Sequence, residues 1–337
     1  MTTTPTLTPA QSRRSAAAVL GHDISSAKNL TDALALAGLD WTVRLVPASD
    51  VPIPDADGSG NTTLMDCPGR RFAVRSDKPI ILGVAGSRYA ELQHDTFFAL
   101  GQVAHEVAGA EWTFGGELDH GRRVFMQMRI PNGDVLIGGQ DLLTTQIRLT
   151  TTHDGRGAHL SIVTTRLACT NGMHVAFPGM SLVTKITHTR SVREQVTKAK
   201  EYVKDAMRHA KAMSALGAEM LDTPMTLQEF CDVADSIWPE PQHLDEQYKV
   251  TRAWKTWSER RKGLCDLYAF GQTTEVGRGT AWGAFNALTE WSDWGTVVRD
   301  GAGVGREAAR ARRQFDLDST RPTRYARALV GSAVLTA

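Results

Sequence analysis

The feature that most constrains the fold is a change in hydrophobic period at Ser191. Before this residue, apolar and polar side chains alternate in short runs, whereas after it apolar residues recur at spacings of four and three. A period of two is typical of half-buried strands, and alternating spacings of four and three place one apolar seam along a helix. The seam comprises Val192, Val196, Ala199, Val203, Ala206, Ala210 and Met213. We therefore predict that residues 112–215 form an antiparallel sheet followed by one long helix.

The predicted fold class is α+β, with a mostly helical C-terminal part. Turn signals rich in Gly, Asp and Asn separate the alternating runs, and short turns join antiparallel neighbours. The expected strands cover residues 41–46, 72–75, 80–84, 112–118, 123–130, 142–151 and 159–168. The expected helices cover residues 29–37, capped by Thr31, and 92–108, 191–215, 247–269, 281–291 and 306–315.

The domain organisation follows from composition along the 337 residues, enough for one large or two ordinary domains. Residues 47–63 are too dense in Pro, Gly and Asp for regular structure, and residues 222–247 carry seven acidic residues without Lys or Arg. We expect a boundary near residue 220. The predicted units are a disordered tail at 1–15, an α+β core domain at 16–220, a helical subdomain at 221–320 and a basic tail at 321–337.

Overall charge does not identify a partner, because 38 basic residues are balanced by 37 acidic ones. Attraction to nucleic acid would have to come from local clusters. Cys67, Cys169, Cys231 and Cys265 are far apart and match no disulfide framework, so we expect reduced thiols. No apolar run approaches the length of a membrane span, and we expect a cytoplasmic protein without a membrane partner.

A basic stripe along the predicted long helix is the most informative functional signal. Its positive charges could neutralise the phosphates of a nucleic acid, with help from Arg88, Arg122 and Arg123. Tyr89 and Phe125, near Arg88 and Arg123, could stack on bases or be packed in the core. The alternative is a solvated flank whose side-chain stems cover the edge of the seam. The stripe comprises Arg193, Lys200, Lys204, Arg208 and Lys211.

Two glycine-containing segments are candidate phosphate sites. Gly83, Gly86 and Ser87 follow an apolar run, so backbone N–H groups there could cradle a phosphate, although a tight turn between strand and helix explains the same residues. Arg278 precedes a predicted helix and could meet an anion at its N-terminus. Capping of that helix by Thr280 explains this segment as well.

Signatures of catalysis are mostly missing, and we predict no catalytic residue, no metal and no cofactor. The spacings of His153, Cys169, His174 and His188 match no ligand pattern, which favours structural roles. Glu290 and Asp293 could form an acid/base pair. We favour a solvated helix face for these two, because carboxylates are mostly exposed.

Three segments resemble the phage/plasmid-like protein family, a domain of unknown function found in phages, plasmids and bacterial hosts. They are ILGVAGSRY at 81–89, TRLACTNG at 165–172 and GTAWGAFNALTE at 279–290, and their order and spacing match across residues 70–295. The resemblance implies a role in phage or mobile-element DNA metabolism. The outline of hairpins followed by a basic helix is also similar to phage single-strand annealing recombinases, which oligomerise.

Three functional hypotheses follow. The leading one is a protein that binds and anneals single-stranded DNA in recombination or replication and self-associates into a homo-oligomer. The second is an enzyme that acts on nucleotides or nucleic acid, using the 83–88 segment for phosphate and His153 or Asp154 in catalysis. The third is an assembly factor whose helical seam pairs with another copy.

Overall fold

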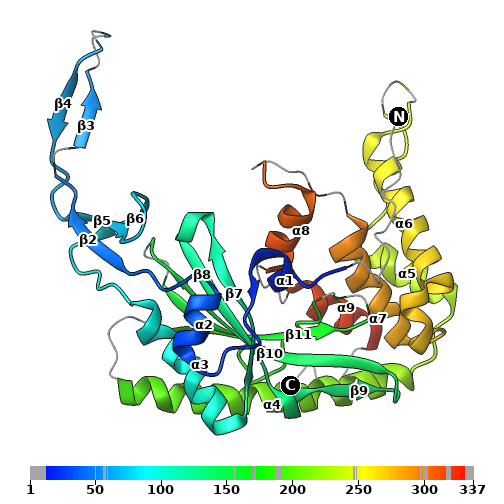
Figure 1. Ribbon diagram of the computed structural model, residues 1–337. Helices are drawn as coiled ribbons and strands as arrows, with labels where there is room; N and C mark the ends of the chain where they lie inside the picture. Colours follow the sequence, from blue (N-terminus) through cyan, green and yellow to red (C-terminus); the bar gives the residue numbers. More distant parts are fainter. Residues whose placement is uncertain are drawn as a thin grey trace.

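The computed structural model describes residues 13–49, 51–55, 58, 60–154, 157–168, 170, 172–186, 192–245, 247, 249–296, 298, 303–315 and 320–330. Figure 1 shows a central sheet with helices beneath it, an arm of strands on one side and a group of helices on the other. The α+β class predicted from the sequence is confirmed. Among the described helices, none combines the length and the apolar composition that crossing a bilayer requires.

The central sheet is antiparallel, with strand order β1-β7-β8-β10-β11-β12 and β9 paired to β10. The four strands predicted just before the long helix are confirmed to within two residues at each end. The strand bounds are β1 His22–Asp23, β7 Glu111–Leu118, β8 Arg123–Arg129, β9 Val135–Ile137, β10 Asp141–Thr152, β11 Ala158–Arg166 and β12 Val183–Ile186.

The two faces of this sheet differ because side chains alternate along each strand. Val124, Met126 and Met128 of β8 pack with Ile147 and Leu149 of β10 in one apolar core. Helices α2 (Leu30–Leu36), α3 (His94–Ala108) and α4 (Val192–Leu221) cover this face. The intervening residues of β8 and β10 therefore point to the opposite face. There α1 (Ala16–Leu20) and α8 (Arg306–Phe315) form a smaller apolar cluster around Phe125.

Helix α4 connects the two halves of the molecule. Val203 and Ala206 lie in the core under the sheet, whereas Met213 and Leu216 lie in a second core at the helical end. Tyr202 anchors the helix through its hydroxyl, which lies 2.8 Å from each of the carbonyl oxygens of Leu160 and Leu182 and shares its single proton between them. One 30-residue helix thus supports both cores.

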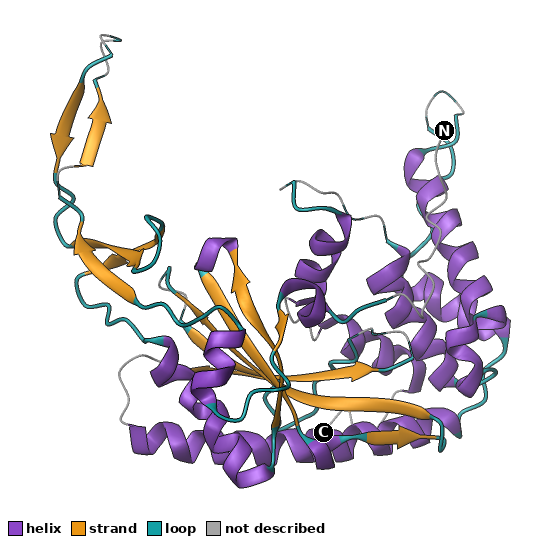
Figure 2. Cartoon of the chain, viewed as in Figure 1, coloured by secondary structure: helices purple, strands orange, loops and turns teal. Residues whose placement is uncertain are grey.

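The helical end is built from α4, α5 (Leu227–Ile237), α6 (Arg252–Phe270), α7 (Ala281–Glu290) and α9 (Thr320–Val330) (Figure 2). Helix α5 was not predicted and lies in the acidic stretch, where Thr226 and Glu229 form a capping box. Helix α9 occupies part of the predicted basic tail and buries Tyr325 and Ala326. The sequence did not predict this helix, because the arginines of α9 alternate with residues that pack on α7.

A disulfide corrects the expectation that all cysteines are reduced. Cys231 of α5 and Cys265 of α6 are bonded, with their Cα atoms 6.3 Å apart. The two residues are 34 positions apart in sequence, and only the packing of the helices brings them together. Cys67 is free and exposed, and Cys169 lies outside the described residues.

The arm contains two small sheets that project from the body (Figure 1). Strands β2 (Val43–Pro47), β5 (Arg70–Arg75) and β6 (Ile81–Gly86) form its base, and β3 (Val51–Pro54) pairs with β4 (Thr62–Met65) beyond it. The expectation that residues 47–63 lack regular structure is corrected by this ribbon. At the start of the chain, Asn29 rather than Thr31 caps α2, since its Oδ1 accepts from the N–H of Asp32 at 2.9 Å.

Candidate functional site

The predicted basic stripe lies on the outer face of α4. Lys200, Lys204, Arg208 and Lys211 are all exposed, while Val203 and Ala210, on the same helix, are buried. Spacings of four, four and three keep the cations on one helix face. The side chain of Arg193 lies outside the described residues.

The lysines of the stripe have no ion-pair partner within the described part of the chain. Arg208 pairs with Asp205, one turn away on the same helix, whereas Lys200, Lys204 and Lys211 form no such contact. A stripe of exposed, largely unpaired cations is therefore available to an external polyanion.

The seam itself is core rather than an interface over residues 203–213. Val203, Ala206, Ala210 and Met213 are each buried within the same chain. The hypothesis that this seam pairs with a second copy is wrong for these residues. The side chains of Val192, Val196 and Ala199 lie outside the described set.

The structure separates the stripe from the three arginines expected to assist it. Arg88 is exposed in the turn after β6 on the arm, and Arg122 is exposed at the β7–β8 turn. Arg123 lies on the sheet face opposite α4, where it lines a cleft of about 270 Å³ with Arg148, His159 and Phe315. The sequence indicated that these arginines could assist the stripe. It did not indicate that the fold places them away from α4.

The expected phosphate loop is part of a strand. Gly83 and Gly86 lie within β6 and pair with Ala73 and Arg70 of β5, and α3 begins only at His94. A Cβ atom on Gly83 would lie 2.6 Å from the Cα of Asp154, so glycine permits a close approach of two backbones. The tight turn begins at Gly86, whose carbonyl accepts from Tyr89 N–H at 3.0 Å, and it contains the exposed Ser87. The interpretation as a turn is favoured here.

The second phosphate candidate has an internal partner. Exposed Arg278 donates to the carbonyl of Gly271 at 3.0 Å. Thr280 occupies the N-cap position of α7, but its hydroxyl donates to Gly277 at 2.7 Å and does not cap the helix. Thr280 thus lies where the capping interpretation placed it, at the start of α7, but its side chain does not form the capping hydrogen bond.

His153 belongs to a buried chain of hydrogen-bonding groups and not to an open site. Its Nδ1 lies 2.6 Å from Oε1 of Glu91, and its Nε2 lies 3.0 Å from Nε2 of His94. Nδ1 of His94 in turn lies 2.9 Å from the carbonyl oxygen of Leu39. Both imidazoles are buried, which supports the structural role favoured for His153. His188 and Cys169 lie outside the described residues, and no metal-binding group occurs among those described.

Two of the sequence segments that carry the family resemblance meet at Asp141. Nε of Arg166, from the 165–172 segment, lies 2.7 Å from both carboxylate oxygens of Asp141. Nε1 of Trp282, from the 279–290 segment, donates to the same carboxylate at 2.9 Å. All three side chains are buried. Because a buried charge is costly without a partner, this contact ties the sheet to α7.

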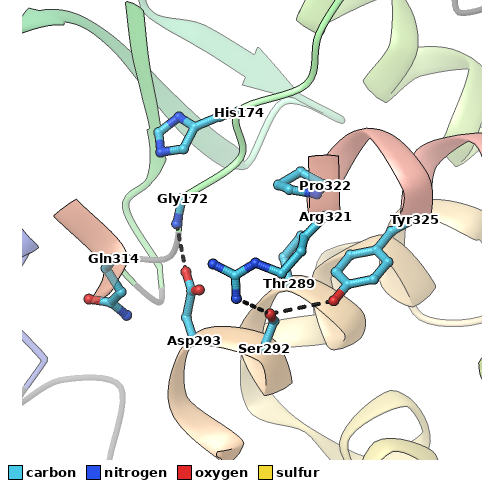
Figure 3. A pocket seen from close by; sticks show the side chains of 9 residues that line it. All are labelled: Gly172, His174, Thr289, Ser292, Asp293, Gln314, Arg321, Pro322 and Tyr325. Carbon is cyan, nitrogen blue, oxygen red and sulfur yellow. Dashed lines mark hydrogen bonds between the residues drawn. The ribbon is translucent and has the colours of Figure 1, made fainter. Parts of the chain in front are cut away.

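Glu290 and Asp293 are not on a solvated face, and that interpretation was wrong. Glu290 is buried and forms an ion pair of 2.7 Å with the buried Arg13. Asp293 follows in a turn of π-helix, Trp291–Gly295, and accepts from the backbone N–H of Gly172 at 3.0 Å (Figure 3). Asp293 faces inward because Gly172 and residues of α9 cover it, and Glu290 because Arg13 and Thr273 contact it.

Asp293 lines a small pocket whose other polar groups are mostly hydrogen-bond donors. Figure 3 shows Arg321, Gln314 and His174 around it. Nδ1 of His174 accepts from the N–H of Thr164 at 3.2 Å, so the proton of the neutral ring is on Nε2. The pocket has a volume of about 20 Å³, which is room for roughly one water molecule. It is too small for a nucleotide.

The electrostatics of this pocket are set mainly by burial. Burial raises the pKa of Asp293 to about 6, against the opposing effects of the Gly172 N–H and of Arg321, Arg313 and Arg310. Burial, followed by the nearby Arg148, lowers the pKa of His174 to about 3, which keeps the ring neutral at pH 7. No sequence pattern connects these two residues, because their proximity depends on contacts between distant segments.

Comparison with known proteins places the chain in a family. Its fold defines an α+β protein in which an antiparallel sheet is backed by one long helix. Residues 81–315 match the model of a domain of unknown function, DUF932, and the match spans well over half of the chain. The chain therefore belongs to this family. No curated protein and no solved structure matches it.

Proposed function

We propose that this protein binds single-stranded DNA through the outer face of α4 and promotes annealing in phage or mobile-element recombination or replication. The observation that carries the proposal is the stripe Lys200, Lys204, Arg208 and Lys211, which is exposed on a helix whose apolar seam is buried. Glu201 and Asp205 lie on the same side of the helix, but only Arg208 pairs with one of them, so the stripe keeps an excess of positive charge.

The dimensions of the stripe suit an extended polyanion. Lys211 lies eleven positions after Lys200, and a rise of 1.5 Å per residue gives about 16 Å. Four contacts with a single strand would contribute a slope of about −3 to the dependence of log affinity on log salt, at roughly −0.7 per phosphate. Annealing requires neutralised backbones and accessible bases, and an open helix face leaves the bases uncovered.

The context of phages and mobile elements rests on the three sequence segments described above. Two of them meet at the buried carboxylate of Asp141, which supports a shared fold rather than a shared chemistry. The enzyme hypothesis receives no support from its named residues. Gly83 lies within a strand and His153 is buried away from solvent.

Charge reversal with a matched control tests the proposal. The test variant changes Lys200, Lys204, Arg208 and Lys211 to Glu. The control changes four exposed cations at or near α6, which are Lys249, Arg252, Lys255 and Lys262, so both variants undergo the same change in net charge. Binding to an oligonucleotide and annealing of complementary strands are measured across a salt series.

We expect the α4 variant to lose annealing and to bind with a slope smaller in magnitude by up to about 3. The control should retain most of its annealing activity and most of its salt dependence, because its changes alter only long-range electrostatics. Equal losses in the two variants would show that net charge and not the stripe governs binding. Unchanged affinity in the α4 variant would exclude the proposal.

A further inference from the structure

The β3–β4 ribbon is an exposed apolar element at the far end of the arm (Figure 1). Ile53, Leu64 and Met65 have exposed fractions of 43%, 62% and 54%. The eight residues of its two strands include no charged side chain, and their polar side chains are those of Thr62 and Thr63. An isolated two-stranded ribbon is marginally stable in water. Apolar side chains on both faces and two open edges therefore indicate a partner.

The two edges of the ribbon are not equivalent. Val51 pairs with Met65 and Ile53 with Thr63, and the N–H of Asp55 donates to Asn61 at 3.0 Å, continuing the same alternation. Residues 51, 53 and 55 therefore direct their backbone groups toward β4, and Pro52 and Pro54 face outward. Proline has no N–H, so the outer edge of β3 cannot donate to an added strand. The outer edge of β4 retains the N–H groups of Thr62 and Leu64.

We infer that β4 pairs with β4 of a second copy of this chain, antiparallel and about a two-fold axis. The outward N–H groups of Thr62 and Leu64 then pair with Leu64 and Thr62 of the other copy, with Thr63 at the axis. The product is a four-stranded sheet, β3-β4-β4-β3, with prolines on both outer edges. Such a contact uses the same surface twice and closes after two copies. The prolines prevent further strands from adding.

Charge argues against a polyanion as the occupant, and β4 itself carries no charged side chain that would oppose a second copy. Residues 47–69 contain four aspartates and neither Lys nor Arg, so a phosphate backbone or an anionic membrane would be repelled. The proposed register places Asp66 opposite the turn that ends at Gly60, not opposite another carboxylate. Like charges directly opposite one another would destabilise the pairing, and this register avoids them.

A cysteine trap tests the register directly. Cys67 is exposed and is first changed to Ser, so that it cannot cross-link. In this background, Thr63→Cys places two thiols at a directly opposed pair, with Cα atoms about 4.5 Å apart, within the range of a disulfide. Thr62→Cys is the control. In the proposed register residue 62 lies opposite residue 64 of the other copy, so the two introduced thiols are not directly opposed. We expect covalent dimers from Thr63→Cys and few from Thr62→Cys. Equal trapping at both positions, or none, would overturn the inference.

Proline substitutions test the edges without cross-linking. Leu64→Pro removes an outward N–H from β4 while leaving the contacts with β3, and light scattering should show conversion from dimer to monomer. Pro52→Thr with Pro54→Thr opens the blocked edge, and we expect assemblies larger than a dimer. The melting temperature of the body should not change, because no residue of β3 or β4 belongs to its cores. A wild-type chain that remains monomeric, or masses unaffected by these changes, would contradict the inference.

Discussion

The imidazole rings of His94 and His153 meet edge to edge in the core, with their Nε2 atoms 3.0 Å apart. The carbonyl of Leu39 only accepts hydrogen bonds, so Nδ1 of His94 donates to it and Nε2 of the neutral ring accepts from His153. The contact joins the start of α3 to the turn between β10 and β11. It gives both buried imidazoles a hydrogen-bond partner inside the core.

His94 should make the fold sensitive to acid. Burial lowers the pKa of His94 from 6.5 to about 4, so the unfolded chain binds more protons between these values. The stabilisation is therefore complete above pH 6.5 and is lost as pH falls toward 4, amounting to roughly 3 kcal/mol for this group. We expect His94→Gln to reduce the dependence of unfolding free energy on pH in this window. Denaturant titrations at several pH values measure it. An unchanged dependence would contradict the assignment.

Asp293 should have the opposite effect on the pH dependence of stability, making the fold less stable as pH rises. Its pKa is raised from 3.8 to about 6 in the folded chain, so the folded state binds more protons and stability falls as pH rises through this window. Asp293→Asn keeps an acceptor for the N–H of Gly172 but carries no charge. We expect the variant to gain stability over wild type between pH 4 and 7, by on the order of 1–3 kcal/mol. A variant less stable at pH 7 would show that the nearby arginines outweigh burial.

Breaking the ion pair between Arg13 and Glu290 should be costly. Both side chains are buried, and removal of one partner leaves a buried charge without its counterpart. Glu290→Gln should lower the unfolding free energy by about 3–5 kcal/mol. Combining it with Arg13→Met should recover part of this loss. Chemical denaturation of the two single variants and the double variant gives the coupling, and simple additivity would argue against a direct interaction.

Gly83 and Gly86 form a matched pair that separates a structural from a ligand-binding role. A Cβ at Gly83 meets the backbone of His153 and Asp154, whereas nothing lies within 4 Å of one at Gly86. Gly83→Ala should therefore destabilise the fold by about 1–3 kcal/mol, and Gly86→Ala should have little effect. Thermal unfolding distinguishes them. Equal stabilities, together with weakened nucleotide binding in both variants, would instead support the phosphate cradle.

Local sequence signals predicted the regular elements well. The alternation along β8 and β10 and the seam of α4 are each contained in a short segment, and these patterns predicted the type of each element. The capping box of Thr226 and Glu229 was also present in the sequence, but the acidic composition around it suggested a boundary. Helix α9 was missed because its arginines masked an apolar face.

The sequence by itself determined the sheet, the long helix and the one-sided charge of that helix, because each depends on residues within a few positions of one another. The tertiary structure alone decided which charges are buried. Glu290 and Arg13 are 277 positions apart, and Asp293 meets Gly172 across 121. Whether a carboxylate faces water or a partner depends on what packs against its helix. That packing joins segments whose proximity no local pattern records.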